Sequence, residues 1–215
     1  SHPQDAALVA PVFFENELIS YTAIKAHWLD IAGKEPYSTD TVDVFQEGTV
    51  YPGVKLFNKG ELVDDIYKMC IANSRVPNSV AGDINAQAIG VRAGATALKR
   101  ILSKYGIKKF RAAAESIFDA GELIVKNYLK NIPNGEYSGS GQMDSNGVEP
   151  GKVPFDIKVI IEDEKVILDM SNAPPQQNGP INCPLPSTVS TARVAMSMLA
   201  GSNEAPNEGF FRPIE

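Results

Sequence analysis

A helical pattern in the middle of the chain governs how the rest can fold. Residues 83–104 place apolar side chains at steps of three and four, the spacing of one α-helical face. Asp83 suits the N-cap of this helix, and Gly106 suits its C-terminal stop. A second face holds only small residues, so we expect the helix to be packed on two sides. The large face comprises Ile84, Ala88, Val91, Ala95, Leu98 and Leu102, and the small face comprises Ala86, Gly90, Ala93 with Gly94, and Ala97.

A second helix is predicted for residues 108–130, which end before Pro133. Because only residues 105–107 separate the two helices, they predict an antiparallel helical hairpin. The large apolar face would then lie on a sheet, and we favour the second helix over another subunit as the cover of the small face. The remaining sector of the first helix is expected to be polar, with Asn85, Gln87, Arg92, Thr96 and Lys99.

Alternating and apolar runs predict strands on both sides of the helices. Residues 6–14 and 17–26 read as two strands with a tight turn at Glu15 and Asn16. Both faces of the second strand are fairly apolar, so we expect it to be central in its sheet. Residues 28–60 form an irregular, ordered loop region, followed by a short helix over 61–72.

The composition changes after residue 132. Residues 137–143 and 154–172 predict strands, with a turn at Asp163 and Glu164. An irregular linker over 173–186 leads to a last helix from Ser187 to Gly201. The expected fold class is therefore α/β: a mixed sheet that carries a metal site, a helical hairpin and a second β-rich segment. The corresponding segments are residues 1–82, 83–132 and 133–215, all within one compact piece of a longer subunit.

Charge and composition exclude some classes of function. The net charge is −6 and the sequence pI is about 5.1, with no run of basic residues, which argues against a nucleic-acid-binding surface. No apolar run approaches the roughly 20 residues of a membrane helix. Cys70 and Cys183 lie far apart and form no CxxC motif, so we expect reduced, buried thiols in a cytoplasmic protein.

Three side chains suit a divalent metal ion: His2, Asp5 and His27. The sequence holds only two histidines. His2 and Asp5 lie on a loop that enters the first predicted strand, and His27 ends the second, so an antiparallel hairpin can bring all three together. Two imidazoles and a carboxylate leave open coordination positions, as catalysis requires. Asp30 is a candidate partner that fixes the tautomer of a histidine ring. Two plainer readings stay open: His2 belongs to an expression tag, and His27 is a strand-end histidine satisfied by backbone.

Other polar groups are weaker candidates. Glu47 lies in the ordered loop region and is a candidate general acid or base, against a solvated loop carboxylate. The turn at residues 178–182 is either a substrate-binding turn or a structural one, and Arg212 binds an anion or a structural carboxylate. The sequence contains no GxGxxG, Walker or GxSxG motif. Any use of ATP therefore belongs to another chain or to a segment outside this one.

Several segments together resemble the hydantoinase B family. They include GPINCP and AHWLDIAG, and the resemblance extends in order over nearly the whole chain. The family contains the B-type component of ATP-dependent N-methylhydantoinase, the second half of oxoprolinase, and the metal-containing large subunit of acetone and acetophenone carboxylases. The matching residues are His2 to Asp5, 10–33, 45–57, 73–87, 169–184 and 207–214.

The resemblance implies a division of labour between two subunits. A hydantoinase A-type partner binds ATP with Mg and phosphorylates the substrate, and the B-type subunit completes the reaction around one divalent metal ion, Mn, Zn or Fe. The family's ligands are a His-x-x-Asp pair and a later histidine, which match His2, Asp5 and His27. The family often has a second histidine where Trp28 stands in this sequence, so Trp28 is expected to narrow the space beside His27.

The activity that the resemblance favours is ATP-dependent opening of a cyclic amide, such as a hydantoin or 5-oxoproline. One alternative is ATP-dependent carboxylation of a ketone by a related assembly. Another is a non-catalytic scaffold subunit that shapes the complex around its ATP-binding partner.

Overall fold

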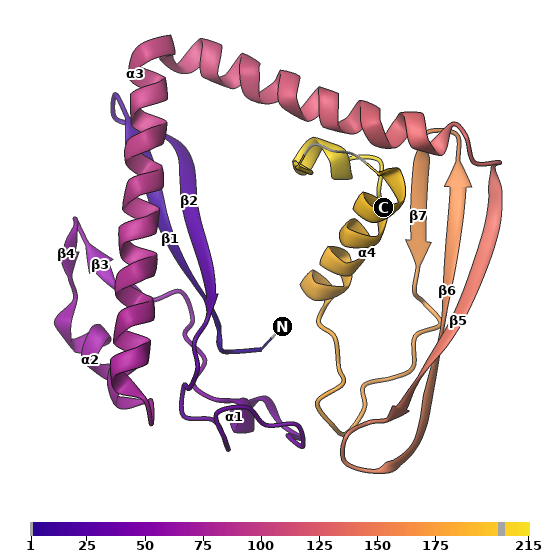
Figure 1. The fold of residues 1–215 in the computed structure, drawn as a ribbon, viewed down its shortest axis with the longest axis horizontal. Coiled ribbons are helices and arrows are strands. Elements are labelled where there is room, and N and C mark those ends of the chain that lie inside the picture. Colours follow the sequence, from indigo (N-terminus) through magenta and orange to yellow (C-terminus); the bar gives the residue numbers. More distant parts are fainter. Residues whose placement is uncertain (1, 202–204) are drawn as a thin grey trace. The chain divides into compact units, whose positions relative to one another are not determined.

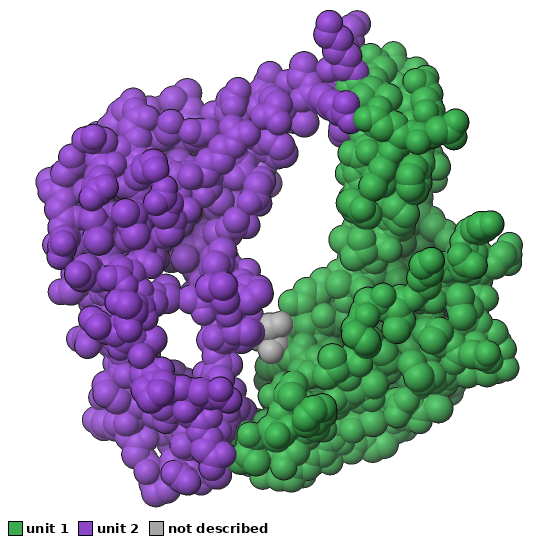
Figure 2. Space-filling model, turned by 180° about the vertical axis from the view of Figure 1, so that it is seen from behind, with its two compact units in different colours: residues 1–107 green, residues 108–215 purple. Residues whose placement is uncertain are grey.

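The computed structural model describes residues 2–201 and 205–215. The chain divides into two compact units, residues 1–107 and 108–215, which Figure 2 colours separately. Both units contain helices and strands (Figure 1), which confirms the mixed α and β class. No helix in the described part of the chain is both long and apolar enough to span a membrane.

The first unit begins with a β-hairpin. Strands β1 (Asp5–Phe14) and β2 (Glu17–His27) pair in antiparallel register, and the two turn residues both have positive φ, 50° at Glu15 and 64° at Asn16. Positive φ at both central positions is typical of a two-residue type I′ turn, so the predicted turn is confirmed. In the described residues β2 pairs with β1 alone. The expected mixed sheet with a central second strand is therefore wrong; apolar residues on both faces of β2 did not indicate a third strand.

Helix α3 (Pro77–Leu129) is interrupted at Gly106, where φ is 78° and ψ is 160°. The predicted stop at Gly106 is confirmed, and the helical segments before and after it pack within different units. The helix begins at Pro77 rather than at Asp83. Proline suits the first turn of a helix, where its missing N–H is not needed, and residues 77–82 carry too few apolar side chains to show a helical period.

Both the large and the small face of α3 are packed in the first unit. The large face is buried at Ile84 and Val91. A Cβ added at Gly90 would clash with Cδ1 of Ile24, and one at Gly94 would lie 3.1 Å from Thr22 Cγ2. Strand β2 therefore covers the small face at Gly90 and Gly94, whereas Ala86 and Ala93 are exposed. The expectation that the second helix covers this face is wrong.

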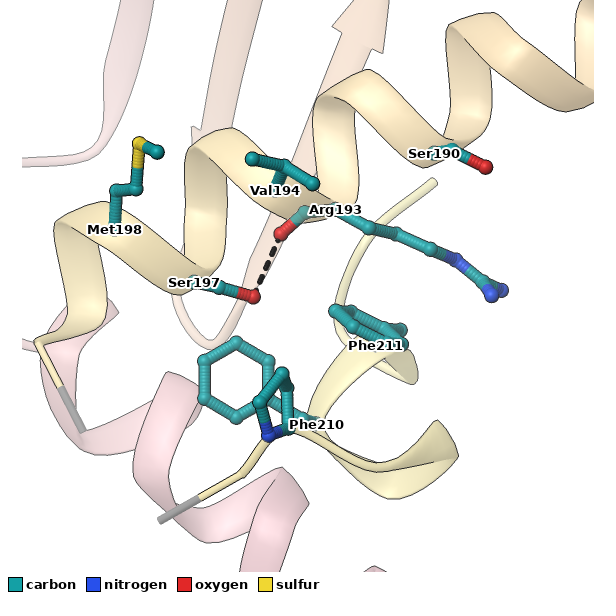
Figure 3. Close-up of a pocket in the computed structure, with 8 residues that line it drawn as sticks. Ser190, Arg193, Val194, Ser197, Met198, Phe210 and Phe211 are labelled. Atoms are coloured by element: carbon teal, nitrogen blue, oxygen red, sulfur yellow. Dashed lines mark hydrogen bonds between the residues drawn. The ribbon is translucent and has the colours of Figure 1, made fainter. Parts of the chain in front are cut away.

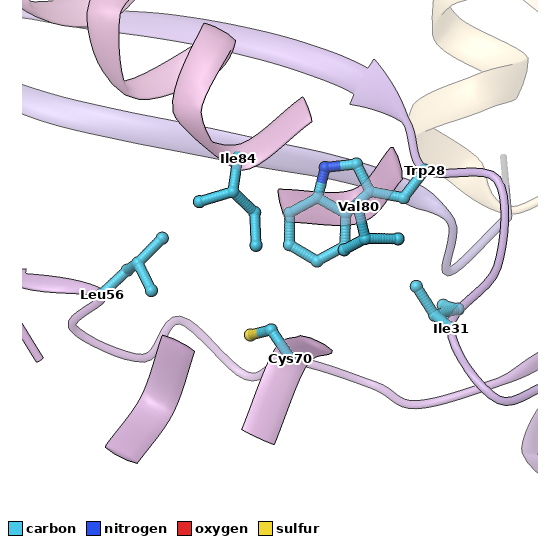
Figure 4. Close-up of a cluster of buried hydrophobic side chains, with 6 residues drawn as sticks. All are labelled: Trp28, Ile31, Leu56, Cys70, Val80 and Ile84. Atoms are coloured by element: carbon cyan, nitrogen blue, oxygen red, sulfur yellow. The ribbon is translucent and has the colours of Figure 1, made fainter. Parts of the chain in front are cut away.

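A core cluster lies between α3, the residues that follow β2, and helix α2 (Asp64–Ala72). Figure 4 shows the indole of Trp28 close to Val80 and Ile84 of α3. The expected irregular region contains only the short α1 (Val44–Glu47) and β3 (Phe57–Asn58). The predicted helix over 61–72 begins at Asp64 instead, because residues 61–62 form strand β4 (Glu61–Leu62). The buried members of the cluster are Trp28, Ile31, Leu56, Cys70, Val80 and Ile84.

The second unit has a three-stranded antiparallel sheet in the order β5 (Gly135–Ser145), β6 (Pro150–Glu162), β7 (Lys165–Asp169). Asp163, with a φ of 54°, forms the predicted turn between β6 and β7. Helix α4 (Leu185–Ala200) ends before Gly201, as predicted, but begins two residues earlier than the predicted Ser187. Gly201 has the left-handed conformation, and the 3-10 helix η1 (Glu208–Phe211) follows. The core of this unit comprises Val125, Leu129, Ile161, Val166, Met196 and Phe210.

Candidate metal centre

The first two candidate ligands lie at the two ends of one tight turn. The backbone N–H of Asp5 donates to the carbonyl of His2 at 3.0 Å, which closes a four-residue turn. The N–H of His2 also lies 3.4 Å from Oδ2 of Asp5. Pro3 fixes the backbone between them in a conformation that suits a turn. The turn therefore holds both side chains at the start of β1.

Strand register brings the third candidate to the same place. Asp5 is directly opposite His27 in the β1–β2 pair, and Nδ1 of His27 lies 3.2 Å from Oδ1 of Asp5. The rings of His2 and His27 meet edge to face, with centroids 5.7 Å apart. The hairpin thus gathers the three side chains at its open end, although 25 positions separate the histidines in sequence. Their role as metal ligands stays a prediction.

Lys25 forms an ion pair with Asp5 and so adds a positive charge to the cluster. Nζ of Lys25 lies 3.1 Å from Oδ2 of Asp5, the carboxylate oxygen that His27 does not contact. Burial opposes ionisation of Asp5, but the hydrogen bonds from His27 and Lys25 outweigh it and lower the pKa of Asp5 to about 2. The carboxylate is therefore charged over the whole physiological range, which is the form that binds a cation.

The donor atoms of this cluster suit a divalent ion, but the three side chains are not yet arranged around one common point. Two ligands of one tetrahedral ion at about 2.1 Å would be roughly 3.4 Å apart, close to the 3.2 Å between Asp5 Oδ1 and His27 Nδ1. Within residues 2–201 and 205–215, however, no group of three His, Cys, Asp or Glu side chains is positioned to hold a metal. Because the ammonium group of Lys25 occupies Oδ2 of Asp5, an ion bound through that oxygen would have to displace Lys25.

Tyr37 joins the cluster from the loop region, and it was not among the predicted site residues. Its ring centroid lies 6.2 Å from that of His2 and 6.5 Å from that of His27. The residue is 67% exposed, so its ring is open to contact from a ligand. A tyrosine inside an irregular loop follows no periodic pattern, and only the position of the loop after His27 could have indicated it.

The loop region is held against the turn by backbone contacts near Glu47. The side-chain amide of Gln4 donates to the carbonyl of Glu47 at 3.0 Å. Gly33 and Gly48 allow the two loop segments to approach, because a Cβ at Gly33 would lie 2.7 Å from the carbonyl oxygen of Glu47. The backbone of Glu47 is thereby placed beside Gln4, one of the two residues between His2 and Asp5. The role of its carboxylate as a general acid or base stays a prediction.

Asp30 does not have the partner that we expected. Its side chain is fully buried, and the guanidinium and backbone N–H of Arg75 bind both of its oxygens, whereas the Nδ1 partner of His27 is Asp5. Hydrogen bonds from Arg75 hold the pKa of Asp30 below its ordinary value against the effect of burial. Arg75 also donates to the carbonyls of Gly33 and Lys34. Asp30 therefore anchors the loop after β2, and the expectation that it orients His27 is wrong.

Trp28 is also placed differently from its prediction. It is 6% exposed and packs in the core under the hairpin (Figure 4). Successive residues of an extended chain point to opposite faces, so Trp28 and His27 diverge. Trp28 therefore does not narrow the space beside His27.

The remaining polar candidates have structural partners. Arg212 pairs with Glu115, Asp119 and Glu122 of α3 in the second unit. The side chain of Asn182 closes its own turn by donating to the carbonyls of Gln177 and Gly179. Both groups thus have the structural role that was the alternative to ligand binding. The two thiols are free, as predicted, but Cys183 is exposed, so the expectation that both are buried is wrong.

The second unit also has an open cavity of about 540 Å³ between α4 and η1 (Figure 3). Among the lining residues that the structure describes, the one charged residue is Arg193, which forms an ion pair with Glu208 and stacks over the ring of Phe211. The other lining residues are Ser190, Val194, Ser197, Met198, Pro206 and Phe210. This cavity brings together no set of catalytic side chains, so the cluster around Asp5 is the stronger candidate.

Comparison with known proteins gives consistent matches over the full length. The family profile described as hydantoinase B/oxoprolinase matches residues 1–215. The B-type component of a putative D-/L-hydantoinase from a Pseudomonas species is 30% identical over 229 residues, covering 100% of this chain and 39% of that protein.

Two solved structures share the fold. The ATP-dependent caprolactamase of Pseudomonas jessenii superposes with a TM-score of 0.92 at 28% identity, over 100% of this chain and 37% of that one. A nucleotide-free acetone carboxylase superposes with a TM-score of 0.90 at 19% identity, over 100% of this chain and 30% of that one. The chain thus spans well under half the length of these relatives.

Proposed function

The chain belongs to the hydantoinase B/oxoprolinase family, and on that premise we propose that it carries the metal site of an ATP-dependent enzyme that opens a cyclic amide. The family match confirms the resemblance drawn from the sequence motifs. The substrate would be a hydantoin, an N-methylhydantoin or a lactam of the 5-oxoproline type. A separate hydantoinase A-type partner would bind ATP with Mg and phosphorylate the amide oxygen.

The observation that carries the proposal is the convergence of His2, Asp5 and His27 at the open end of one hairpin. These residues would hold one divalent ion, with Mn, Zn and Fe all compatible with two nitrogens and one oxygen. When bound, the ion would hold water or polarise the activated carbonyl.

The chain's own residues would prepare this centre and its surroundings. Asp5 supplies a permanent negative charge, and Lys25 balances that charge in the absence of an ion. Tyr37 brings an exposed aromatic ring within 6.5 Å of both histidine rings, where it can contact the substrate. Glu47 is our candidate for proton transfer, since its backbone carbonyl accepts a hydrogen bond from Gln4, which lies between the two N-terminal ligands in sequence.

Phosphorylation explains why such an assembly needs ATP. An unactivated ring amide has a poor leaving group and opens slowly at neutral pH. Transfer of a phosphoryl group to the carbonyl oxygen would activate the carbonyl carbon toward water. When water adds, the ring C–N bond breaks, the nitrogen takes up a proton, and an acyl phosphate is formed. A second water molecule would then displace phosphate from the acyl carbon, which gives the open-chain acid and phosphate. The sequence has no phosphate-binding loop of its own, which is why the proposal assigns this step to the partner.

The relatives favour amide opening over ketone carboxylation. Identity is 30% to the hydantoinase component and 28% to the caprolactamase, against 19% to the acetone carboxylase, whose likeness concerns the fold alone. A scaffold subunit without chemistry is the remaining alternative. A scaffold has no need for two histidines and a carboxylate at one point, which is why we favour a catalytic role.

The test is ATP turnover by the full-length subunit assembled with its partner. We expect cyclic amides to stimulate ATP hydrolysis and to be opened without bicarbonate, and His27→Ala to abolish opening. Turnover that requires bicarbonate and a ketone would instead support the carboxylase. Full activity of the His27→Ala assembly would support the scaffold.

A further inference from the structure

Gln87 is a polar residue buried in an apolar part of α3. Its side chain is 3% exposed, and Ile84, Ala88 and Val91 around it on the helix are buried as well. The sequence pattern placed Gln87 in the polar sector of this helix, and that expectation is wrong. Burying a side-chain amide costs free energy unless its donors and acceptor are satisfied.

Three hydrogen bonds satisfy this amide. Oε1 of Gln87 accepts from the indole Nε1–H of Trp28 at 2.8 Å. Its Nε2 group donates to the carbonyl of Ala6 in β1 and to that of Ile24 in β2, both at 2.9 Å. Both amide hydrogens and the oxygen are therefore used, and a single side chain of α3 binds both strands of the hairpin.

The positions of these three partners relate Gln87 to the metal candidates. Ala6 directly follows Asp5, Trp28 directly follows His27, and Ile24 lies three residues before His27. The Nε2 group thus restrains the backbone of both strands just inside the Asp5–His27 pair, and Oε1 holds the side chain of Trp28, the residue after His27. It does so from the core face, while the two candidate ligands lie on the other face of the hairpin.

We infer that Gln87 is a positioning residue of the candidate metal centre, which holds Asp5 and His27 at the spacing that an ion requires. The inference rests on the proposed function in so far as that function assigns these two residues to a metal. An apolar side chain would fill the same space among Ile84, Ala88 and Val91, but it would give neither strand a directional restraint. Gln87 does not contact the ion or the substrate.

A nearby residue provides a matched control. Oγ1 of Thr22 donates to the carbonyl of Val91 at 2.9 Å, which also ties β2 to α3. This bond lies five residues from His27 and two strand positions further from the open end than Ile24. Thr22→Val removes one bond between helix and hairpin and leaves the end with the candidate ligands untouched.

The experiment compares Gln87→Met with Thr22→Val in the full-length subunit, titrated with Mn²⁺ and Zn²⁺ by calorimetry. We expect Gln87→Met to weaken metal binding by roughly 10–100-fold, the usual effect of losing a group that orients a ligand, and Thr22→Val to change it less than about twofold. Both variants should lower the melting temperature of the metal-free protein. Equal loss of metal affinity in the two variants, or wild-type affinity in Gln87→Met, would overturn the inference.

Two further readouts keep the test decisive. Trp28 is the only tryptophan of the chain, so its indole N–H resonance reports directly on the bond to Gln87. If Gln87→Met does not fold, Trp28→Phe removes one of the three bonds, and unchanged metal affinity in that variant would also contradict the inference. If the wild type binds no metal, the proposed function fails, while amide exchange over residues 24–28 still tests positioning. Faster exchange there in Gln87→Met than in Thr22→Val is the expected result, and equal exchange the contrary one.

Discussion

At the scale of single residues, the candidate centre is a carboxylate shared between a histidine and a lysine. His27 contacts one oxygen of Asp5 and Lys25 contacts the other. Lys25 and His27 are two residues apart on β2 and so lie on the same face, where Lys25 is diagonal to Asp5. The ammonium group therefore provides the positive charge that an ion would otherwise provide, and it competes with the ion.

Replacement of Lys25 by methionine should tighten metal binding. The variant keeps the length of the side chain and removes the competing charge, so we expect roughly fivefold higher affinity, equivalent to about 1 kcal/mol for a surface ion pair. Calorimetric titration with Zn²⁺ measures it. Lys34→Met is the control, because Lys34 pairs with Asp40 in the loop. Weaker binding in Lys25→Met than in the control would show that the ion does not replace Lys25.

The ion pair of Asp30 predicts a dependence of stability on pH. Arg75 lowers the pKa of Asp30 in the folded state below the unfolded value of about 3.9. The charged carboxylate therefore stabilises the fold at pH values above about 4, and this contribution is lost as the pH falls through the folded pKa.

Urea unfolding of wild type and Asp30→Asn over pH 2–7 tests this dependence. The wild type should be the more stable protein at pH 7, and the difference should shrink progressively below pH 4. Asp65→Asn, at an exposed position in α2, should show no comparable difference. A difference between wild type and Asp30→Asn that stays constant with pH would mean that the charge of Asp30 contributes nothing.

Sequence reasoning identified the candidate metal ligands but missed two residues that reach the cluster only through the fold. His2, Asp5 and His27 were predictable because the chain has two histidines and the hairpin turn fixed which residues meet. Lys25 and Tyr37 are ordinary surface residue types, and only their places in the folded hairpin and loop bring them to the cluster.

At the scale of elements, the packing of α3 on the hairpin depends on small side chains. Gly90 and Gly94 let the helix approach Ile24 and Thr22 of β2. The small face was predictable from its residue types, but its partner was not, because sequence neighbours suggested the next helix. Likewise, the burial of Gln87 could not be predicted, since a glutamine in an amphipathic pattern normally marks the solvent side.

A bulky side chain at Gly90 should destabilise the first unit. Gly90→Leu forces added volume against Ile24, where a Cβ alone already clashes with its terminal methyl group, at a cost of roughly 1–3 kcal/mol. Thr96→Leu places the same side chain at an exposed position of the same helix and should be tolerated much better. Thermal melts of the two variants compare them directly. Equal, small shifts would show that the helix does not pack closely on β2.

At the scale of the whole molecule, the chain accounts for 37–39% of the length of its hydantoinase and caprolactamase relatives. In the proposed function its own contribution would be the metal centre, and ATP would be bound by a partner. The family and the fold were predictable because motifs extend in order from His2 to residue 214, whereas the substrate depends on residues around the site that no motif identifies.

The protein on its own should neither bind nor hydrolyse ATP. This prediction rests on the proposed function and on these 215 residues, which contain no glycine-rich phosphate-binding loop. Isothermal calorimetry of the purified full-length protein with Mg·ATP should show no heat of binding. The same titration in the presence of the partner should show binding. Tight ATP binding without the partner would contradict the assignment of ATP to the partner.

Metal content measures the central claim most directly. Full-length protein, purified without chelators and analysed by plasma mass spectrometry, should contain about one divalent ion per chain, because two imidazoles and one carboxylate make a single site. His27→Ala should lose most of this ion, while Thr22→Val, on the same strand, should retain it. Near-stoichiometric metal in His27→Ala, or a wild type without metal after incubation with Mn²⁺, Zn²⁺ and Fe²⁺, would contradict the assignment of His2, Asp5 and His27.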